Sequence, residues 1–143
     1  MGESTEAKAL RSTPFFADLS PEDIGGILQV GRPVTFDPDQ VIIEQGDRAD
    51  GMYIIVDGTA EVDVGGRFHT LTVGDFFGEM ALVTPGTRMA TVTAVQPVRA
   101  LKIPADAFRA FVLEHPAVAL SMLQAVVERL REVEQRIDAW MAS

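Results

Sequence analysis

The chain contains no cysteine and only two histidines among its 143 residues. Disulfides and thiolate metal sites are therefore excluded, and a reducing compartment suits the chain. His69 and His115 lack the His-x-His or Glu-x-x-His spacing of a metal site, which argues against a jelly-roll metalloenzyme. No Ser–His–Asp or paired-carboxylate arrangement can be recognised either. These absences favour a binding protein without a metal over an enzyme.

Basic residues are scarce as well, with 12 Lys and Arg against 21 Asp and Glu and a net charge of −9. Direct binding to DNA or RNA usually needs a basic patch, and none is visible. No run of about 18 apolar residues could span a membrane, and Met1 to Arg11 lacks the apolar centre of a signal peptide. We expect a cytoplasmic protein. It can still bind a small anion, because carboxylates beyond the screening length of about 8 Å matter less than one arginine in contact.

The length fits a single domain with a real core, since domains most often have about 100–150 residues. We expect one domain over 1–143, with an N-terminal helical segment (1–31), a β-roll (32–103) and C-terminal hinge and lid helices (104–143). In the first segment, Ser20-Pro21-Glu22-Asp23 predicts a helix start with a serine cap and proline at the first helical position. The apolar residues before this cap are expected to pack back onto the helix: Phe15, Phe16 and Leu19.

The middle segment alternates short apolar runs with turn residues, which is typical of a barrel or jelly roll. Gly65-Gly66 favours a two-residue hairpin turn with positive φ. The last two runs are predicted to pair with each other across Gln96-Pro97. Strands are expected at 34–36, 41–43, 52–56, 60–64, 68–71, 91–95 and 98–103. The acidic residues between them are interpreted as solvated turn residues: Asp37, Asp39, Asp47 and Asp50.

The C-terminal segment predicts one helix from Pro104 to about Glu114 and a second from Pro116 to about Met141, separated by a break at His115-Pro116. In the second helix, apolar residues recur every seven positions, as in a coiled coil. This heptad stripe could close over the roll of its own subunit or pair with the same helix of a second chain, and both remain open. The stripe consists of Leu123, Val126, Leu130, Val133, Ile137 and Trp140.

The residues with the most distinctive chemistry lie between 76 and 92. Gly78 permits a ligand to approach the backbone, and Glu79 to Leu82 can form one helical turn with free N–H groups. Pro85-Gly86 returns the chain, so that Arg88 can face the same place. A guanidinium matches phosphate oxygens, and a carboxylate accepts from a sugar hydroxyl, so a nucleotide with a free 2′-OH would fit. The alternative is a structural ion pair between Glu79 and Arg88 on a barrel loop.

The order of these residues goes further than their chemistry. Phe77-Gly78-Glu79-Met80-Ala81-Leu82, followed by Arg88-Met89-Ala90-Thr91-Val92, resembles the phosphate-binding cassette of the cyclic nucleotide-binding domain family, which includes catabolite activator-like proteins. Gly46-Asp47 and Gly58 upstream are similar to the family's first barrel glycines. The resemblance covers about Phe15 to Trp140. It implies a mainly β fold with flanking helices: a double-stranded, jelly-roll-like β-roll with N-terminal helices and two C-terminal helices.

The resemblance also implies roles for single residues. Glu79 would bind the ribose 2′-hydroxyl and Arg88 the cyclic phosphate. By likeness to the catabolite activator branch, Arg129 would reach Glu79 or the ribose and Val133 would meet the base. The phosphate cradle would be completed by backbone amides around Gly78, Met80, Ala81, Met89 and Ala90.

Two residues depart from the family pattern. Members often have proline directly before the arginine, whereas this chain has Thr87. Members that prefer cyclic GMP often have Thr or Ser directly after it, whereas this chain has Met89, whose thioether is a weak acceptor. Cyclic AMP is therefore the expected ligand, ahead of cyclic GMP.

The prediction is a regulatory sensor in which ligand binding moves the C-terminal helices, with a possible homodimer through the last helix. Its main rival is an interaction module with the same fold and a degenerate pocket. The chain could also be the regulatory fragment of a larger transcription factor, channel or enzyme, and nothing in the sequence identifies the downstream effector.

Overall fold

In the computed structural model, which describes residues 4–142, the apolar run at 52–56 is the middle of strand β3 (Gly51–Asp57). Successive side chains of a strand point to opposite faces of its sheet. The even-numbered side chains of β3 pack into a core shared with the helices, whereas Tyr53 and Ile55 pack into a second core between two sheets. Burial on both faces explains why this run carries no charged residue.

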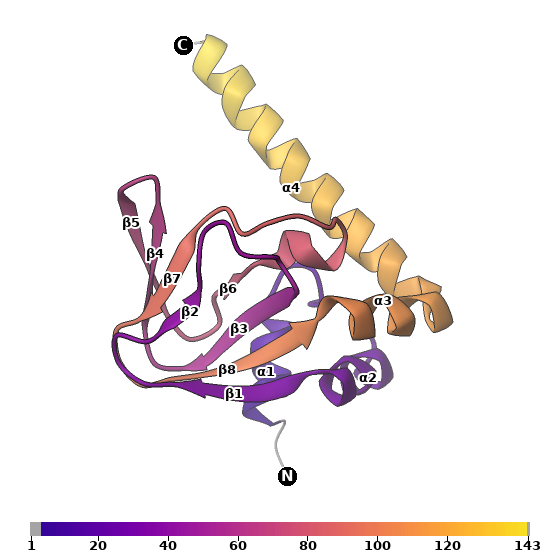
Figure 1. Cartoon of the computed structure of the whole chain (residues 1–143). Coiled ribbons are helices and arrows are strands. Elements are labelled where there is room, and N and C mark those ends of the chain that lie inside the picture. The colour runs from indigo at the N-terminus through magenta and orange to yellow at the C-terminus, as the bar shows by residue number, and fades with distance from the viewer. Residues whose placement is uncertain (1–3, 143) are drawn as a thin grey trace.

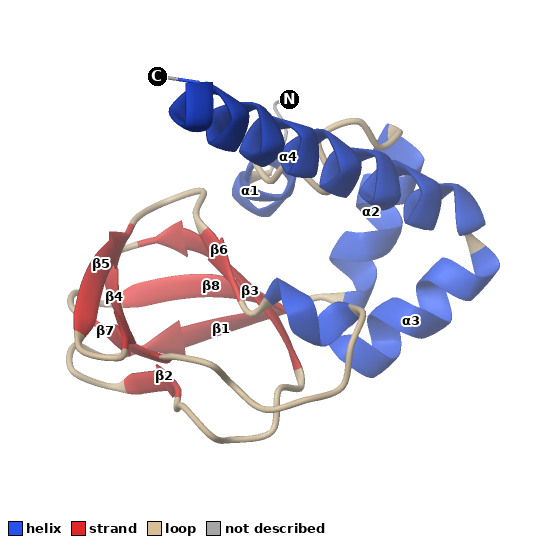
Figure 2. Ribbon diagram, turned by 90° about the horizontal axis from the view of Figure 1, so that it is seen from above, coloured by secondary structure: helices blue, strands red, loops and turns tan. Residues whose placement is uncertain are grey.

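Two four-stranded sheets, antiparallel throughout, pack against each other and form the expected β-roll (Figure 2). Gly65-Gly66 makes the predicted hairpin turn, with φ values of 58° and 84°. The first sheet has the order β1 (Arg32–Phe36), β8 (Val98–Pro104), β3 and β6 (Phe76–Phe77). The second has the order β2 (Val41–Ile43), β7 (Thr91–Ala94), β4 (Ala60–Val64) and β5 (Arg67–Leu71).

The predicted pairing of the last two strands is wrong. β7 lies between β2 and β4, whereas β8 lies between β1 and β3 in the other sheet. The chain crosses between the sheets after β7, where the N–H groups of Val95 and Gln96 donate to the carbonyl of Thr59 at 2.9 and 3.2 Å. Both strands are central, so a hairpin between them would remove the partners that each needs on its two edges.

The helices lie on one side of the roll (Figure 2). The Ser20 hydroxyl accepts a hydrogen bond from the Asp23 N–H at 3.1 Å, which confirms the predicted cap of α2. The sequence analysis gave no bounds for the first helix. In the structure Ser4 caps this helix, and its residue Leu10 is fully buried. Phe15, Phe16 and Leu19 share a core with α2, as expected. The helices are α1 (Thr5–Arg11), α2 (Pro21–Val30), α3 (Ala105–Glu114) and α4 (Pro116–Ala142).

The first half of helix α4 packs against the rest of the chain through Met122 and Ala125, and its C-terminal end projects away from the roll (Figure 1). Val118 near its start is fully buried, but the six residues of the heptad stripe are exposed, from 45% for Val133 to 78% for Trp140. The structure therefore does not close the stripe over the roll of its own subunit. Within residues 4–142, no single helix is long and apolar enough to cross a membrane; α3 and α4 pass that test only together, across a bend of 111°.

Candidate functional site

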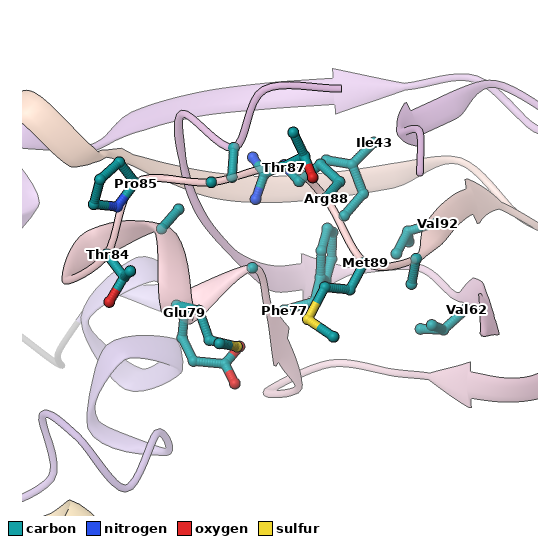
Figure 3. Close-up of a pocket in the computed structure, with 16 residues that line it drawn as sticks. Ile43, Val62, Phe77, Glu79, Thr84, Pro85, Thr87, Arg88, Met89 and Val92 are labelled. Atoms are coloured by element: carbon teal, nitrogen blue, oxygen red, sulfur yellow. The ribbon is translucent and has the colours of Figure 1, made fainter. Parts of the chain in front are cut away.

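A cavity of about 190 Å³ lies between a short 3₁₀ helix, η1 (Glu79–Leu82), and the segment that returns to β7 (Figure 3). Apolar side chains from β2, β4, β6 and β7 form its inner wall: Ile43, Val62, Phe77 and Val92. All seven residues predicted to bind the ligand line this one cavity: Gly78, Glu79, Met80, Ala81, Arg88, Met89 and Ala90. The turn at Pro85-Gly86 thus brings two cassette segments together, as the sequence predicts.

The guanidinium of Arg88 is held in a fixed orientation at the wall of the cavity. Its side chain is only 4% exposed. Nη1 donates to the carbonyl of Gly51 at 2.8 Å, and Nη2 donates to Oδ1 of Asp50 at 3.0 Å. A guanidinium has five N–H donors. The other three find no acceptor among residues 4–142, so Arg88 keeps donors for an anionic ligand.

Gly78 makes this placement of Arg88 possible. Its φ is +78°, in the left-handed region that favours glycine. A Cβ at this position would lie 2.5 Å from Nη1 of Arg88 and 3.0 Å from the carbonyl oxygen of Gly51. The bare backbone of Gly78 therefore both caps η1 and makes room for the guanidinium.

Glu79 faces the same cavity with its carboxylate unpaired. The residue is half-buried, and no described side chain or backbone group forms a hydrogen bond or ion pair with its carboxylate. Arg88 pairs with Asp50, so the alternative of an ion pair between Glu79 and Arg88 is not realised. A half-buried carboxylate without a partner remains a free acceptor for hydroxyl groups.

The backbone amides of the cassette are only partly available. The N–H of Ala81 donates to the carbonyl of Gly78 at 3.1 Å within the 3₁₀ turn. The N–H groups of Met89 and Ala90 have no acceptor within the described range 4–142. The Met89 side chain is exposed and lies at the rim of the cavity (Figure 3).

Sequence analysis interpreted Asp50 as a solvated turn residue and missed its place at the site. Its Oδ1 accepts from Arg88 and its Oδ2 accepts from Nζ of Lys102 at 2.9 Å. Burial raises the pKa of Asp50, but the hydrogen bond from Lys102 and the charges of Lys102 and Arg88 outweigh it and lower that pKa overall. The three residues are far apart along the chain, so no local motif could have grouped them.

The two predicted lid residues lie away from the cavity. The guanidinium carbon of Arg129 sits 5.5 Å from the centre of the Phe15 ring and 6.0 Å from that of Phe76. Val133 lines a separate hollow on α4 together with Trp140. None of the described residues of α3 or α4 lines the cavity. The contacts predicted for Arg129 and Val133 with a bound ligand therefore stay predictions.

No group of three or more His, Asp or Glu residues in the described part of the chain could hold a metal ion. The site combines an oriented guanidinium, a free carboxylate and an apolar wall.

Comparison with known proteins agrees with this geometry. The chain is 27% identical over 129 residues to a CRP-like cAMP-activated global transcriptional regulator of Mycobacterium tuberculosis, a match that covers 86% of the chain and 58% of the regulator. It is 31% identical over 124 residues to the mouse potassium/sodium hyperpolarization-activated cyclic nucleotide-gated channel 3, covering 86% of the chain and 16% of the channel. The chain thus spans little more than half of the first relative and a small part of the second.

Among solved structures, the N-terminal domain of a transcriptional regulator from Streptomyces coelicolor superposes with a TM-score of 0.80 at 28% identity, covering 90% of this chain and 94% of that one. The family model for the cyclic nucleotide-binding domain matches residues 33–115, more than half of the chain. The chain therefore belongs to the cyclic nucleotide-binding domain family, and its β-roll is of the catabolite activator type.

Proposed function

We propose that the chain is a regulatory module that binds cyclic AMP and transmits binding to its C-terminal helices. The observation that carries this proposal is that one cavity is lined by two groups of opposite charge that do not bond to each other. They are a buried guanidinium with unpaired donors and a half-buried carboxylate without a partner. A cyclic nucleotide supplies the complementary pair, an anionic phosphate and a 2′-hydroxyl on the same ring system.

In this proposal the polar groups of the cassette bind different parts of the nucleotide. Arg88 binds the cyclic phosphate, assisted by the free N–H groups of Met89 and Ala90. Glu79 accepts from the ribose 2′-hydroxyl. At about 190 Å³ the cavity is smaller than the ~300 Å³ at the lower end of ligand pockets, so part of the nucleotide would extend beyond it. That part, the base, is what a lid would cover.

Met89 supports cyclic AMP over cyclic GMP. It follows Arg88 directly and its side chain is 72% exposed at the cavity rim. A thioether sulfur is a weak acceptor, so it offers little to the amino group of a guanine. The relative in Mycobacterium tuberculosis, described as cAMP-activated, is in line with this choice.

Two hydrogen bonds support coupling between the ligand site and α3. Nη2 of Arg109 donates to the carbonyl of Ala81 in η1 at 3.1 Å. The N–H of Ala105, the first residue of α3, donates to the carbonyl of Asp50 at 2.9 Å. A shift of η1 on ligand binding would therefore pull on α3, and the break at His115 would pass the movement to α4. Binding then favours one arrangement of these helices over another, which is a population shift.

Helix α4 would serve as the lid and as a dimer interface. In the bound arrangement Arg129 would leave the Phe15 and Phe76 rings for Glu79 or the ribose, and Val133 would meet the base. An exposed stripe of large apolar residues calls for a partner, and the same helix of a second chain is the one we propose. Amide exchange of α4 should slow when cyclic AMP is added; unchanged exchange would remove the coupling from the proposal.

Calorimetric titration tests the binding proposal. Cyclic AMP and cyclic GMP are titrated into wild type, Arg88→Ala, Arg88→Lys and Glu79→Gln. We expect tighter binding of cyclic AMP, loss of most affinity in Arg88→Ala and little recovery in Arg88→Lys, because a point charge cannot replace the planar fork. Arg99→Ala on the exposed side of β8 is the matched control for loss of one positive charge. Absence of binding to wild type would favour the rival, an interaction module with a degenerate pocket.

The remaining parts of the proposal concern the whole protein. We propose one domain over residues 1–143, of which 1–3 and 143 lie outside the described residues. We further propose a regulator without catalysis and without direct contact with nucleic acid, located in the cytoplasm. The two relatives are a transcriptional regulator and a channel, so the effector that such a module controls differs between members.

A further inference from the structure

The Asp50 carboxylate is shared between two cations, and only one of them lines the cavity. Oδ1 accepts from Arg88 at 3.0 Å and Oδ2 accepts from Nζ of Lys102 at 2.9 Å. Lys102 comes from β8, in the middle of the first sheet, and is absent from the cavity wall. Its side chain is 22% exposed, so most of its length is buried.

The ring of Tyr53 lies close to both cations. The Arg88 guanidinium carbon lies 5.9 Å and Nζ of Lys102 lies 5.5 Å from the centre of the Tyr53 ring, within cation–π range. Burial lowers the pKa of Lys102, but the hydrogen bond and charge of Asp50, with Tyr53, raise it overall. The lowered pKa of Asp50 and the raised pKa of Lys102 both favour the charged forms. With the guanidinium of Arg88, the Arg88–Asp50–Lys102 cluster carries two positive charges and one negative.

The way in which Arg88 and Lys102 share the two oxygens of Asp50 decides how many N–H donors of Arg88 stay available to a ligand. A carboxylate that faces a guanidinium alone tends to bind it through both oxygens, in a bidentate pair. Here Lys102 holds Oδ2, so Arg88 contacts one carboxylate oxygen only and keeps the three donors that bond neither Asp50 nor Gly51. Without Lys102, Asp50 would have both oxygens for Arg88 and would cancel its charge.

We propose that Lys102 is a positioning residue of the ligand site, which raises affinity for an anionic ligand by holding one oxygen of Asp50 away from Arg88. This inference rests on the proposed function, since it concerns the same cavity. Lys102 acts through Asp50 and does not touch the ligand.

The test is a double-mutant cycle measured by titration with cyclic AMP. Lys102→Met keeps the apolar stem and removes the charge; we expect the Kd to rise by roughly two- to fivefold, the upper part of the range for a partly exposed charge pair. Lys102→Arg should restore most of the lost affinity. In an Asp50→Asn background the Lys102→Met substitution should change the Kd by less than about twofold, because the carboxylate through which Lys102 acts is gone.

Two controls separate positioning from other effects. Arg99→Met removes one positive charge from an exposed position of the same strand and should change the Kd by less than about twofold. Thermal denaturation of every variant monitors folding. Should Lys102→Met destabilise the chain, Lys102→Gln replaces it in the cycle.

The outcomes are distinct. If Lys102→Met weakens binding equally in the wild-type chain and in the Asp50→Asn background, Lys102 acts by its general field and the proposal is overturned. An unchanged Kd in Lys102→Met, or a loss of affinity that only follows the loss of folding in both Lys102 variants, overturns it as well. If wild type itself binds no cyclic nucleotide, the proposed function fails, which the same titration reveals before any variant is compared.

Discussion

Replacing Gly78 with alanine would test whether the Arg88 guanidinium must lie against bare backbone. Gly78 combines a φ of +78° with a position at which a Cβ would meet the guanidinium. A methyl group at this position would lie 2.5 Å from Nη1 of Arg88 and 3.0 Å from the carbonyl oxygen of Gly51, the two atoms that bond to each other. The substitution therefore strains the backbone and forces the guanidinium to move.

The two effects have different sizes and different readouts. A left-handed conformation costs a residue with a Cβ about 1–2 kcal/mol of folding free energy. Loss of the bond between Arg88 and the Gly51 carbonyl would add about 1.5–3 kcal/mol, as for a hydrogen bond to a charged group. A displaced guanidinium also presents its donors to the cavity at the wrong angle. We expect at least a tenfold weaker affinity for cyclic AMP, which corresponds to about 1.4 kcal/mol.

Two other glycines separate strain from displacement. Gly86 lies in the same cassette without a left-handed φ, and a Cβ there meets nothing within 4 Å. Gly65 has a φ of +58° and equally open surroundings. In thermal denaturation and calorimetric titration, Gly86→Ala should resemble wild type, Gly65→Ala should lose stability alone, and Gly78→Ala should lose stability and affinity. If Gly78→Ala binds cyclic AMP as tightly as Gly65→Ala does, the guanidinium does not need this space and the reasoning is refuted.

Three further predictions concern the helices and the charge cluster. In α2, Gly26→Ala should destabilise the chain by about 1–3 kcal/mol because its Cβ would collide with the Phe111 ring, whereas Gly25→Ala, with nothing within 4 Å, should stabilise it by up to about 1 kcal/mol in urea denaturation. Burial raises the pKa of Asp50, but its cationic neighbours lower that pKa by more. The contribution of Asp50 to stability is therefore present above the ordinary pKa of 3.8 and is lost as the pH falls through the lowered pKa. The difference in unfolding free energy between wild type and Asp50→Asn should shrink below about pH 4 and not above it. If α4 forms the dimer interface, Leu130→Glu should shift the chain to a monomer in sedimentation velocity while the melting temperature of a diluted sample stays unchanged.

The parts of the fold that the sequence predicts are those that depend on neighbours along the chain. The cap at Ser20 and the turn at Gly65-Gly66 are decided within three or four residues, and both form as expected. The partners of β7 and β8 are not decided locally, because any strand with an apolar face can pair with any other of matching length. Hydrophobic alternation therefore located these strands but placed them in the wrong pair.

The same distinction applies to the site. The cassette residues are close in sequence, so one reversal at Pro85-Gly86 suffices to bring Glu79 and Arg88 to one cavity. Asp50 reaches Arg88 through two adjacent loops, where the Arg88 N–H donates to the carbonyl of Asp47 at 2.7 Å and the Ala49 N–H donates to that of Gly86 at 2.9 Å. Lys102 reaches Asp50 through the sheet, where Gly51 pairs with Pro104 and Tyr53 pairs with Lys102. An aspartate after a turn is usually solvated, and the Asp50 side chain is indeed 57% exposed. The residues that neighbour Asp50 in the sequence therefore did not indicate its two ion pairs.

A buried arginine that binds an anion needs a partner in the unbound state, yet that partner must not block the ligand, and the cluster meets both requirements. A guanidinium that is 4% exposed needs a partner when no ligand is bound, because an unpaired buried charge is strongly destabilising. The partner that satisfies it, here Asp50, is then a competitor for the ligand. A backbone carbonyl at Gly51 and a second cation at Lys102 relieve the competition, since the first supports the guanidinium without a negative charge and the second draws the carboxylate away. The chain has a net charge of −9, and Glu79 brings a second carboxylate to the cavity. Under this proposal the two cations of the cluster offset that nearby negative charge for an anionic ligand, whereas distant carboxylates are screened by water.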